Sequence, residues 1–242
     1  MAEAPIAQVP IAQVPIAPSP MTQIPIATLT PADAAEVREA IQWAAAEGAT
    51  LALTGGASKQ ALGRPVTASH RLALDRLDGV VDYQPSELVL TARAGTALAT
   101  IGALVAQHGQ HLAFEPPDTT VLLGPGRATL GGIVACNLSG PRRPRAGAAR
   151  DHVLGIAAVT GRAEAIKAGG KVVKNVTGYD LPKLFTGSFG TLAALTEITV
   201  KVLPRPEKTR TVLAFGLAAH AASRAMAEVM AGPLEPGGVA YL

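Results

Sequence analysis

Two glycine-rich turns carry the residue types that suit the binding of phosphate. The first, Thr54-Gly55-Gly56-Ala57-Ser58-Lys59, follows an apolar run, Thr50 to Leu53, that predicts a buried strand. Small residues let successive backbone N–H groups converge on one anion, while Ser58 adds a hydroxyl group and Lys59 a positive charge. These residues predict an anion site, and a tight structural turn explains the same sequence about as well.

The second segment is Thr129-Leu130-Gly131-Gly132-Ile133-Val134-Ala135-Cys136-Asn137. It predicts the start of a helix with two glycines in its first turn, where the helix dipole also favours an anion. The two segments begin about 75 residues apart. Together they fit a ligand that carries two phosphates.

Other common signatures are absent or incomplete. Residues 124–129 begin like a dinucleotide fingerprint but lack its third glycine, and the first turn lacks the spacing of a Walker A loop. Ser188 has Thr186 where a nucleophile elbow needs glycine. His108 and His111 form a near pair without a third ligand, so we expect no metal site.

Composition narrows the class of protein. The chain has 242 residues, a formal net charge of +3, one cysteine and 3% aromatic residues. This charge and the scarcity of aromatic residues argue against nucleic-acid binding, and Cys136 alone holds no disulfide framework or iron–sulfur cluster. We find no apolar run long enough to cross a bilayer and no signal peptide. We therefore expect a soluble, cytoplasmic protein.

The chain divides into three parts. Residues 1–29 repeat a unit of the PIAQV type with proline at every fifth position, which predicts an extended, dispensable tail. Residues 30–204 combine helices and short strands in an α+β pattern, with the first helix capped at Thr30. Residues 205–242 predict one strand (Thr211–Phe215), one helix (about Ala218–Met230) and the start of another strand at Val239. This part is too small for a core, so we expect an incomplete second domain.

Within residues 30–204, further elements are expected. They are strands at Arg71–Leu74, Val80–Tyr83, Leu88–Ala92, Gly155–Thr160, Ala163–Lys167, Lys171–Val173 and about Leu195–Val202, and a helix at about Thr96–Gln107.

Residues 171–192, KVVKNVTGYDLPKLFTGSFGTL, carry a specific resemblance. They are similar to the flavin-binding domain of the vanillyl-alcohol oxidase type, the PCMH-type FAD domain. The first glycine turn followed by Gly63-Arg64-Pro65, together with Leu130-Gly131-Gly132, resembles more narrowly the FAD-binding subunits of bacterial glycolate oxidases. The resemblance covers about residues 31–204. It implies two α/β subdomains that bind FAD, followed here by a truncated cap domain.

The resemblance also implies which residues contact FAD. The first turn (Thr54 to Lys59) and the second segment (Thr129, Gly131 and Gly132) would hold the pyrophosphate. Those near the isoalloxazine ring would be Asn137, Ser139 and Gly140. Those at the adenine end would be Val153, Gly155, Glu197 and Ile198. Many relatives have a flavin-linked histidine after the two glycines, whereas this chain has Ala57, so we expect non-covalent FAD.

As a function, the resemblance implies flavin-mediated oxidation of glycolate or another 2-hydroxy acid. It implies a larger flavin subunit and an iron–sulfur subunit as partners, and membrane association only through them. No catalytic base is assigned. The alternative is a non-catalytic assembly subunit with weak or no flavin binding. A basic loop with Arg142, Arg143, Arg145 and Arg150 is either a solvated loop or a contact for an anionic substrate or a partner.

Overall fold

The computed structural model describes residues 27–63, 67–170 and 178–241. The predicted tail up to residue 26, Arg64-Pro65 and the predicted strand Lys171–Val173 lie outside the described residues. The strands are β1 (Ala27–Leu29), β2 (Leu51–Thr54), β3 (His70–Ala73), β4 (Val80–Gln84), β5 (Val89–Arg93), β6 (Gln110–His111), β7 (Val153–Thr160), β8 (Ala165–Gly169), β9 (Ala193–Lys201) and β10 (Leu203–Pro204). The helices are α1 (Ala34–Glu47), α2 (Leu98–Ala106), α3 (Thr120–Leu123), α4 (Leu130–Cys136), α5 (Arg143–Ala146), α6 (Ala149–His152), α7 (Leu181–Phe185) and α8 (Ala219–Ala231), with a 3-10 turn at Pro85–Glu87.

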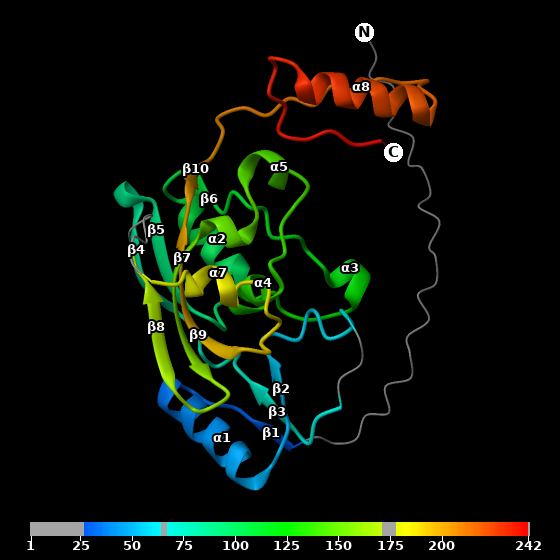
Figure 1. The fold of residues 1–242 in the computed structure, drawn as a ribbon. Helices are drawn as coiled ribbons and strands as arrows, with labels where there is room; N and C mark the ends of the chain where they lie inside the picture. Colours follow the sequence, from blue (N-terminus) through cyan, green and yellow to red (C-terminus); the bar gives the residue numbers. More distant parts are fainter. Residues whose placement is uncertain (1–26, 64–66, 171–177, 242) are drawn as a thin grey trace.

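Two sheets organise the described chain (Figure 1). A parallel three-stranded sheet has the order β1-β3-β2, and an antiparallel five-stranded sheet has the order β4-β5-β9-β7-β8. β6 and β10 form a separate two-stranded pair. The helices and the two kinds of sheet confirm the predicted α+β class.

Strand β9 is the centre of the larger core. It pairs with β5 on one side and β7 on the other, and most of its residues are buried. Ile198 and Val200 of β9 pack with Ile101 of α2 and with Ile133 and Val134 of α4 in one apolar cluster. This packing fixes α4 against the sheet, and α4 carries the second glycine segment.

Helix α1 covers the smaller sheet through a periodic apolar face. Val37, Ile41 and Ala44 are buried at helical spacing, and Val37 and Ile41 pack against Leu72 of β3. The predicted cap at Thr30 is wrong by three residues. Asp33 is the N-cap, and its Oδ1 accepts hydrogen bonds from the N–H groups of Ala35 and Glu36 at 2.8 and 2.9 Å. The carboxylate accepts two donors of the first turn, which the Thr30 hydroxyl, three residues further away, does not do.

The boundary predicted between the tail and the folded part also differs from the structure. Ala27–Leu29, assigned to the tail, form β1 and pair in parallel with β3. The proline repeat obscured this strand, because a short edge strand needs only one partner and tolerates proline just before it.

The other predicted elements have mixed outcomes. The strands at β3, β4, β5, β7 and β9 and the helices α2 and α8 are confirmed with shifted ends, and β8 begins two residues later than predicted. The predicted strands at Thr211–Phe215 and Val239 are wrong: neither segment is a strand. Val212 is 92% and Phe215 87% exposed, and no described strand lies beside this segment to hold it as a strand. Residues 205–241 lie apart from the two sheets, with α8 at the top of Figure 1. Assigning them to a second domain stays a prediction.

Candidate cofactor site

Contact between two glycine turns forms the candidate site. The first glycine turn (residues 54–59) follows β2, and the Gly126 turn (residues 124–128) leads into α4. The Arg127 N–H donates a hydrogen bond to the carbonyl oxygen of Gly56 at 2.6 Å, and Ala57 and Arg127 form a parallel bridge. The structure thus brings together two segments that are about 70 residues apart in sequence.

Glycine is required on both sides of this contact. A Cβ atom at Gly56 would lie 2.0 Å from the carbonyl oxygen of Arg127, and one at Gly126 would lie 2.5 Å from the backbone nitrogen of Ser58. Both distances are far below van der Waals contact, and the opposing atoms belong to the backbone, which moves only if the turns separate. At Gly131 a Cβ atom would lie 2.8 Å from the carbonyl oxygen of Ala94. The lack of a side chain at Gly56, Gly126 and Gly131 therefore allows these segments to pack this closely.

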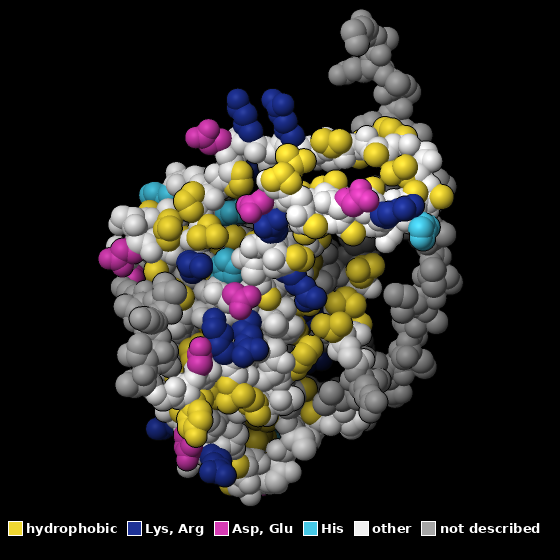
Figure 2. Space-filling view, turned by 45° about the horizontal axis from the view of Figure 1, so that its top comes forward, with side chains coloured by type: hydrophobic (Ala, Val, Ile, Leu, Met, Phe, Trp, Pro, Cys, Tyr) yellow, Lys and Arg dark blue, Asp and Glu magenta, His cyan; other side chains and the backbone are white. Residues whose placement is uncertain are grey.

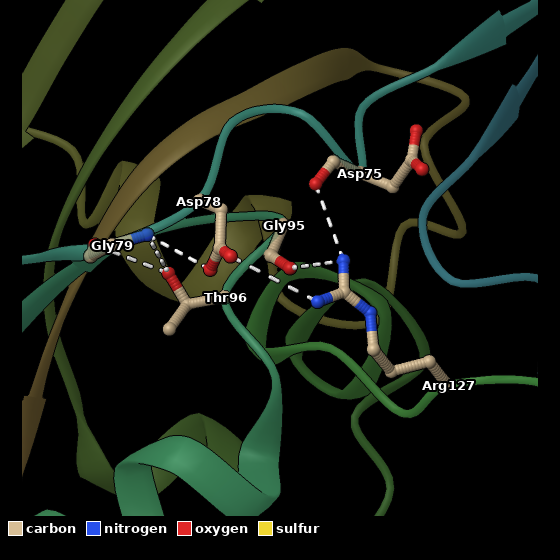
Figure 3. A network of polar contacts seen from close by, with 6 residues as sticks. All are labelled: Asp75, Asp78, Gly79, Gly95, Thr96 and Arg127. Carbon is tan, nitrogen blue, oxygen red and sulfur yellow. Dashed lines mark hydrogen bonds and ion pairs between the residues drawn. The ribbon is translucent and has the colours of Figure 1, made fainter.

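Arg127 ties the Gly126 turn to the first half of the fold (Figure 3). Its Nη2 donates hydrogen bonds to the carbonyl oxygens of Asp75 at 3.2 Å and Gly95 at 3.3 Å, and its Nη1 lies 3.9 Å from a carboxylate oxygen of Asp78. Gly79, next to Asp78, exchanges hydrogen bonds with the hydroxyl group of Thr96. Sequence reasoning missed Arg127. The place of Arg127 between Gly126 and Thr129 could have pointed to a role in the site. The segment does not fit a dinucleotide fingerprint, however, because it lacks the third glycine.

The N–H groups of the first glycine turn suit an anion. Among the described residues, the N–H groups of Gly55, Gly56 and Ala57 donate no hydrogen bond to the protein. Ala57 has φ +61°, a left-handed conformation of the kind found in anion-binding nests. Unpaired backbone donors are costly away from water, so they either face solvent or meet a ligand. This turn has the donors that a diphosphate requires.

The start of helix α4 differs from the first glycine turn in its N–H groups. Its first N–H groups are already used: Leu130 donates to Thr96 O at 2.9 Å, Gly131 to Ala94 O at 2.7 Å, and Gly132 to Thr129 Oγ1 at 3.2 Å. Thr129 is thus the N-cap of α4, which confirms the helix start predicted for this segment. That Thr129, Gly131 and Gly132 contact a phosphate stays a prediction. In the structure they hold α4 against the first half of the fold.

Lys59 supplies the positive charge between the two turns. Its Nζ donates to the Oγ atom of Ser58 at 2.8 Å and lies about 3.5 Å from where a Cβ of Gly132 would stand. Burial lowers the pKa of Lys59, with an opposing contribution from nearby Cys136. Burial also raises the pKa of the Cys136 thiol. A partly desolvated lysine gains from an anionic ligand, which restores a partner for its charge.

The predicted ring-side residues hold the next helix in place. Asn137 Oδ1 accepts the N–H of Arg150 at 3.0 Å, and Ser139 Oγ accepts the N–H of Ala149 at 2.8 Å, so both side chains satisfy donors of α6. The N–H of Gly140 donates to the carbonyl oxygen of Phe114 at 2.9 Å. Their contact with a flavin ring stays a prediction.

The predicted adenine-end residues lie in the large sheet, outside the contact of the two turns. Val153 and Ile198 are buried in the core, Gly155 pairs with Thr199, and Glu197 faces Lys167 at 3.9 Å. These residues connect to α4 through the core, where Ile198 packs with Ile133 and Val134, and through Ala94, which donates to Thr196 O and accepts from Gly131. The structure thus groups Thr54 to Lys59 with the start of α4, and it does not bring Val153, Gly155, Glu197 and Ile198 into that group.

Among the described residues, no three His, Cys, Asp or Glu side chains gather as a metal site would require. No helix in the same ranges has the length and apolar character to cross a bilayer.

Comparison with known families agrees with this site. Residues 25–169 match the model of the FAD binding domain, and the chain belongs to this family. FAD is therefore the cofactor, and its contact with Gly55, Gly56 and Ala57 stays a prediction. The chain is 44% identical to the glycolate oxidase subunit GlcE of Escherichia coli over 203 residues, which cover 84% of this chain and 56% of that protein. It is 32% identical to the glycolate oxidase subunit GlcD of Bacillus subtilis, over 71% of this chain and 35% of that protein.

A solved structure supports the fold. Alkyldihydroxyacetonephosphate synthase matches with a TM-score of 0.59 and 21% identity, over 75% of this chain and 32% of that chain. The chain spans about half or less of the length of these proteins, so the match concerns the FAD-binding part.

Proposed function

We propose that this chain is the FAD-binding subunit of a glycolate oxidase-type complex. Its flavin takes part in the oxidation of glycolate or another 2-hydroxy acid to the corresponding 2-oxo acid. The observation that carries the proposal is the row of free N–H groups at Gly55, Gly56 and Ala57 beside the Lys59 cation. The 44% identity to a glycolate oxidase subunit supports the choice of reaction.

In this proposal the chain places the cofactor. FAD, when bound, accepts the two electrons that leave the hydroxyl-bearing carbon of the substrate. The first glycine turn holds the diphosphate, Lys59 neutralises part of its charge, and Arg127 keeps the opposing turn in register. Thr129, Gly131 and Gly132 complete the binding site from α4, while Asn137, Ser139 and Gly140 face the ring. Val153, Gly155, Glu197 and Ile198 lie at the adenine end.

We infer non-covalent binding from the side chains around the turn. Ala57 has no nucleophilic atom at the position where many relatives carry a histidine. Cys136 lies near Lys59, but burial raises the pKa of its thiol and so keeps it protonated and poorly nucleophilic. Neither residue favours a covalent bond to the flavin.

The electrons leave through partners. A single cysteine cannot bind an iron–sulfur cluster, so an iron–sulfur subunit and a larger flavin subunit complete the pathway. The printed names of the relatives GlcE and GlcD, both glycolate oxidase subunits, support such an assembly. The complex works in the cytoplasm, and membrane contact is made by the partners.

A second candidate is an assembly subunit that binds flavin weakly. It is favoured by exposed apolar side chains in residues 212–217, where Val212, Leu213 and Phe215 are 92%, 65% and 87% exposed. Such a surface is typical of protein–protein contact.

One experiment separates the two candidates. The chain is co-purified with its larger flavin and iron–sulfur subunits, once as wild type and once as Gly56→Ala. FAD content and anaerobic bleaching of the flavin by glycolate are measured. The proposal expects one FAD per copy of this chain in addition to the flavin of the larger subunit, the loss of that FAD in Gly56→Ala, and slower glycolate oxidation in the variant. Equal FAD content and equal rates in both complexes would favour the assembly role.

A further inference from the structure

A groove of about 490 Å³ lies beside α2, and Leu98 of its lining donates through its N–H to the carbonyl oxygen of Ala128 in the Gly126 turn. Its volume is in the range of small-molecule sites in proteins. One wall is apolar and comes from one face of α2. That wall consists of Leu98, Ala99, Gly102, Val105 and Ala106.

The opposite wall carries charge. Arg142 Nη2 contacts Glu115 Oε1 at 2.6 Å, so these two charges largely cancel. Arg205 also lines the groove, and among the described residues its guanidinium makes no ion pair or hydrogen bond. His111 also lines the groove, and its pKa is lowered chiefly by burial and then by Arg142, with Glu115 opposing the shift and Arg205 adding to it. The groove therefore has one uncompensated cation at its polar wall.

Glu115 has an unusual backbone. Its φ is +48°, a left-handed conformation that is strained for a residue with a side chain. A Cβ atom at Gly140 would lie 2.6 Å from the Cβ of Glu115, so close packing holds this conformation in place. Packing against Gly140 holds Glu115 beside Arg142, and their ion pair fixes the guanidinium of Arg142 at the edge of the groove. Glu115 Oε2 and Arg142 Nε are buried there without a hydrogen-bond partner among the described residues.

We propose that this groove binds an amphipathic monocarboxylate, such as a medium-chain fatty acid or its 2-hydroxy derivative. The carboxylate lies against Arg205 and the edge of Arg142, and the alkyl chain lies along the apolar face of α2. Charge complementarity selects the anion, because Arg205 is the one groove cation that Glu115 does not neutralise. A two-carbon acid fills little of this volume and leaves the α2 wall in contact with water. Figure 2, in which the top of the view of Figure 1 comes forward, shows Lys, Arg, Asp and Glu side chains interleaved with hydrophobic ones. The proposal does not depend on flavin or on the proposed reaction.

Calorimetric titration of the purified full chain with acetate, butanoate, hexanoate and octanoate tests this assignment. Each methylene group buried on α2 should raise the affinity about fourfold until the groove is full. Octylamine, which has a similar chain and the opposite charge, should bind at least about tenfold more weakly than octanoate. Equal affinities along the acid series would overturn the proposal and leave the groove to a macromolecular partner. Equal affinities for octanoate and octylamine would overturn it too, because the arginines would then have no role.

Two variants test the two walls separately. A Cβ atom at Gly102 meets nothing within 4 Å, so Gly102→Leu has room, fills the groove and should also favour the helix. We expect this variant to fold and to lose the dependence on chain length. Arg205→Met should weaken octanoate binding about tenfold or more. Arg210→Met, which removes an exposed charge outside the groove, is the matched control and should bind as wild type. Wild-type binding by Gly102→Leu, or equal losses in the two arginine variants, would contradict the proposal.

Discussion

Replacing Gly56 by alanine should separate the first glycine turn from the Gly126 turn. The new Cβ would lie 2.0 Å from the Arg127 carbonyl oxygen, where 3.0 Å is the closest approach that real Cβ atoms show. The turns must therefore move apart by about 1.0 Å, and the 2.6 Å hydrogen bond from Arg127 N to Gly56 O then lengthens to about 3.6 Å, beyond the range of a hydrogen bond. Overpacking costs about 1 to 3 kcal/mol and the lost hydrogen bond about 0.5 to 1.5 kcal/mol.

We therefore expect Gly56→Ala to lower the free energy of unfolding by about 2 to 4 kcal/mol. For a chain of this length the melting temperature should fall by about 5 to 15 °C. FAD affinity should fall about tenfold or more, since the donors of the first glycine turn no longer point to one position. Calorimetric unfolding gives the stability, and titration of the flavin-free protein with FAD gives the affinity.

Gly161→Ala is the matched control. A Cβ atom at Gly161 meets nothing within 4 Å, so this variant tests the general effect of adding a methyl group at an exposed glycine. We expect wild-type unfolding and wild-type FAD affinity. A Gly56→Ala protein that behaves like Gly161→Ala would refute the claim that absent side chains set the contact between the turns.

Three further predictions concern other parts of the fold. Thr129→Ala should destabilise the protein by about 1 kcal/mol, because the Gly132 N–H loses its capping acceptor, and Thr129→Ser should restore most of it in denaturant unfolding. His152 is buried and its pKa is held below 6.5, chiefly by burial, so the unfolded chain takes up a proton first as the pH falls. Stability should therefore decline below about pH 6.5, and the slope should flatten in His152→Gln; an unchanged slope would contradict this. Deletion of residues 1–24 should leave the melting temperature unchanged, whereas deletion of residues 1–29 removes β1 and should lower it; equal melting temperatures would show that β1 contributes nothing.

Local patterns predicted much of the fold. The apolar spacing of Val37 and Ile41 predicted α1, and the alternation along residues 195–202 predicted β9. The prediction of a strand at residues 211–215 was wrong. Val212 and Phe215 are exposed, no described strand lies beside them, and a strand needs a partner that can be distant in sequence.

The candidate site was only partly predictable. Glycines 55, 56, 131 and 132 stand out in the sequence, and the helix start at Thr129 follows from capping rules. The contact of Gly56 with Arg127 depends on how the chain between them returns to β2, which no local pattern encodes. For the same reason no local pattern reveals that the N–H groups of Leu130, Gly131 and Gly132 donate within the protein, whereas those of Gly55, Gly56 and Ala57 have no acceptor among the described residues.

The most direct test of the central claim is the visible absorbance spectrum of the purified chain, repeated on the supernatant after acid denaturation. The account predicts a flavin spectrum in the native protein and a chromophore that acid releases completely, as expected for FAD bound without a covalent bond. A chromophore that stays with the precipitated protein would contradict non-covalent binding. A protein that stays colourless after incubation with FAD would contradict the assignment of the first glycine turn as the FAD site.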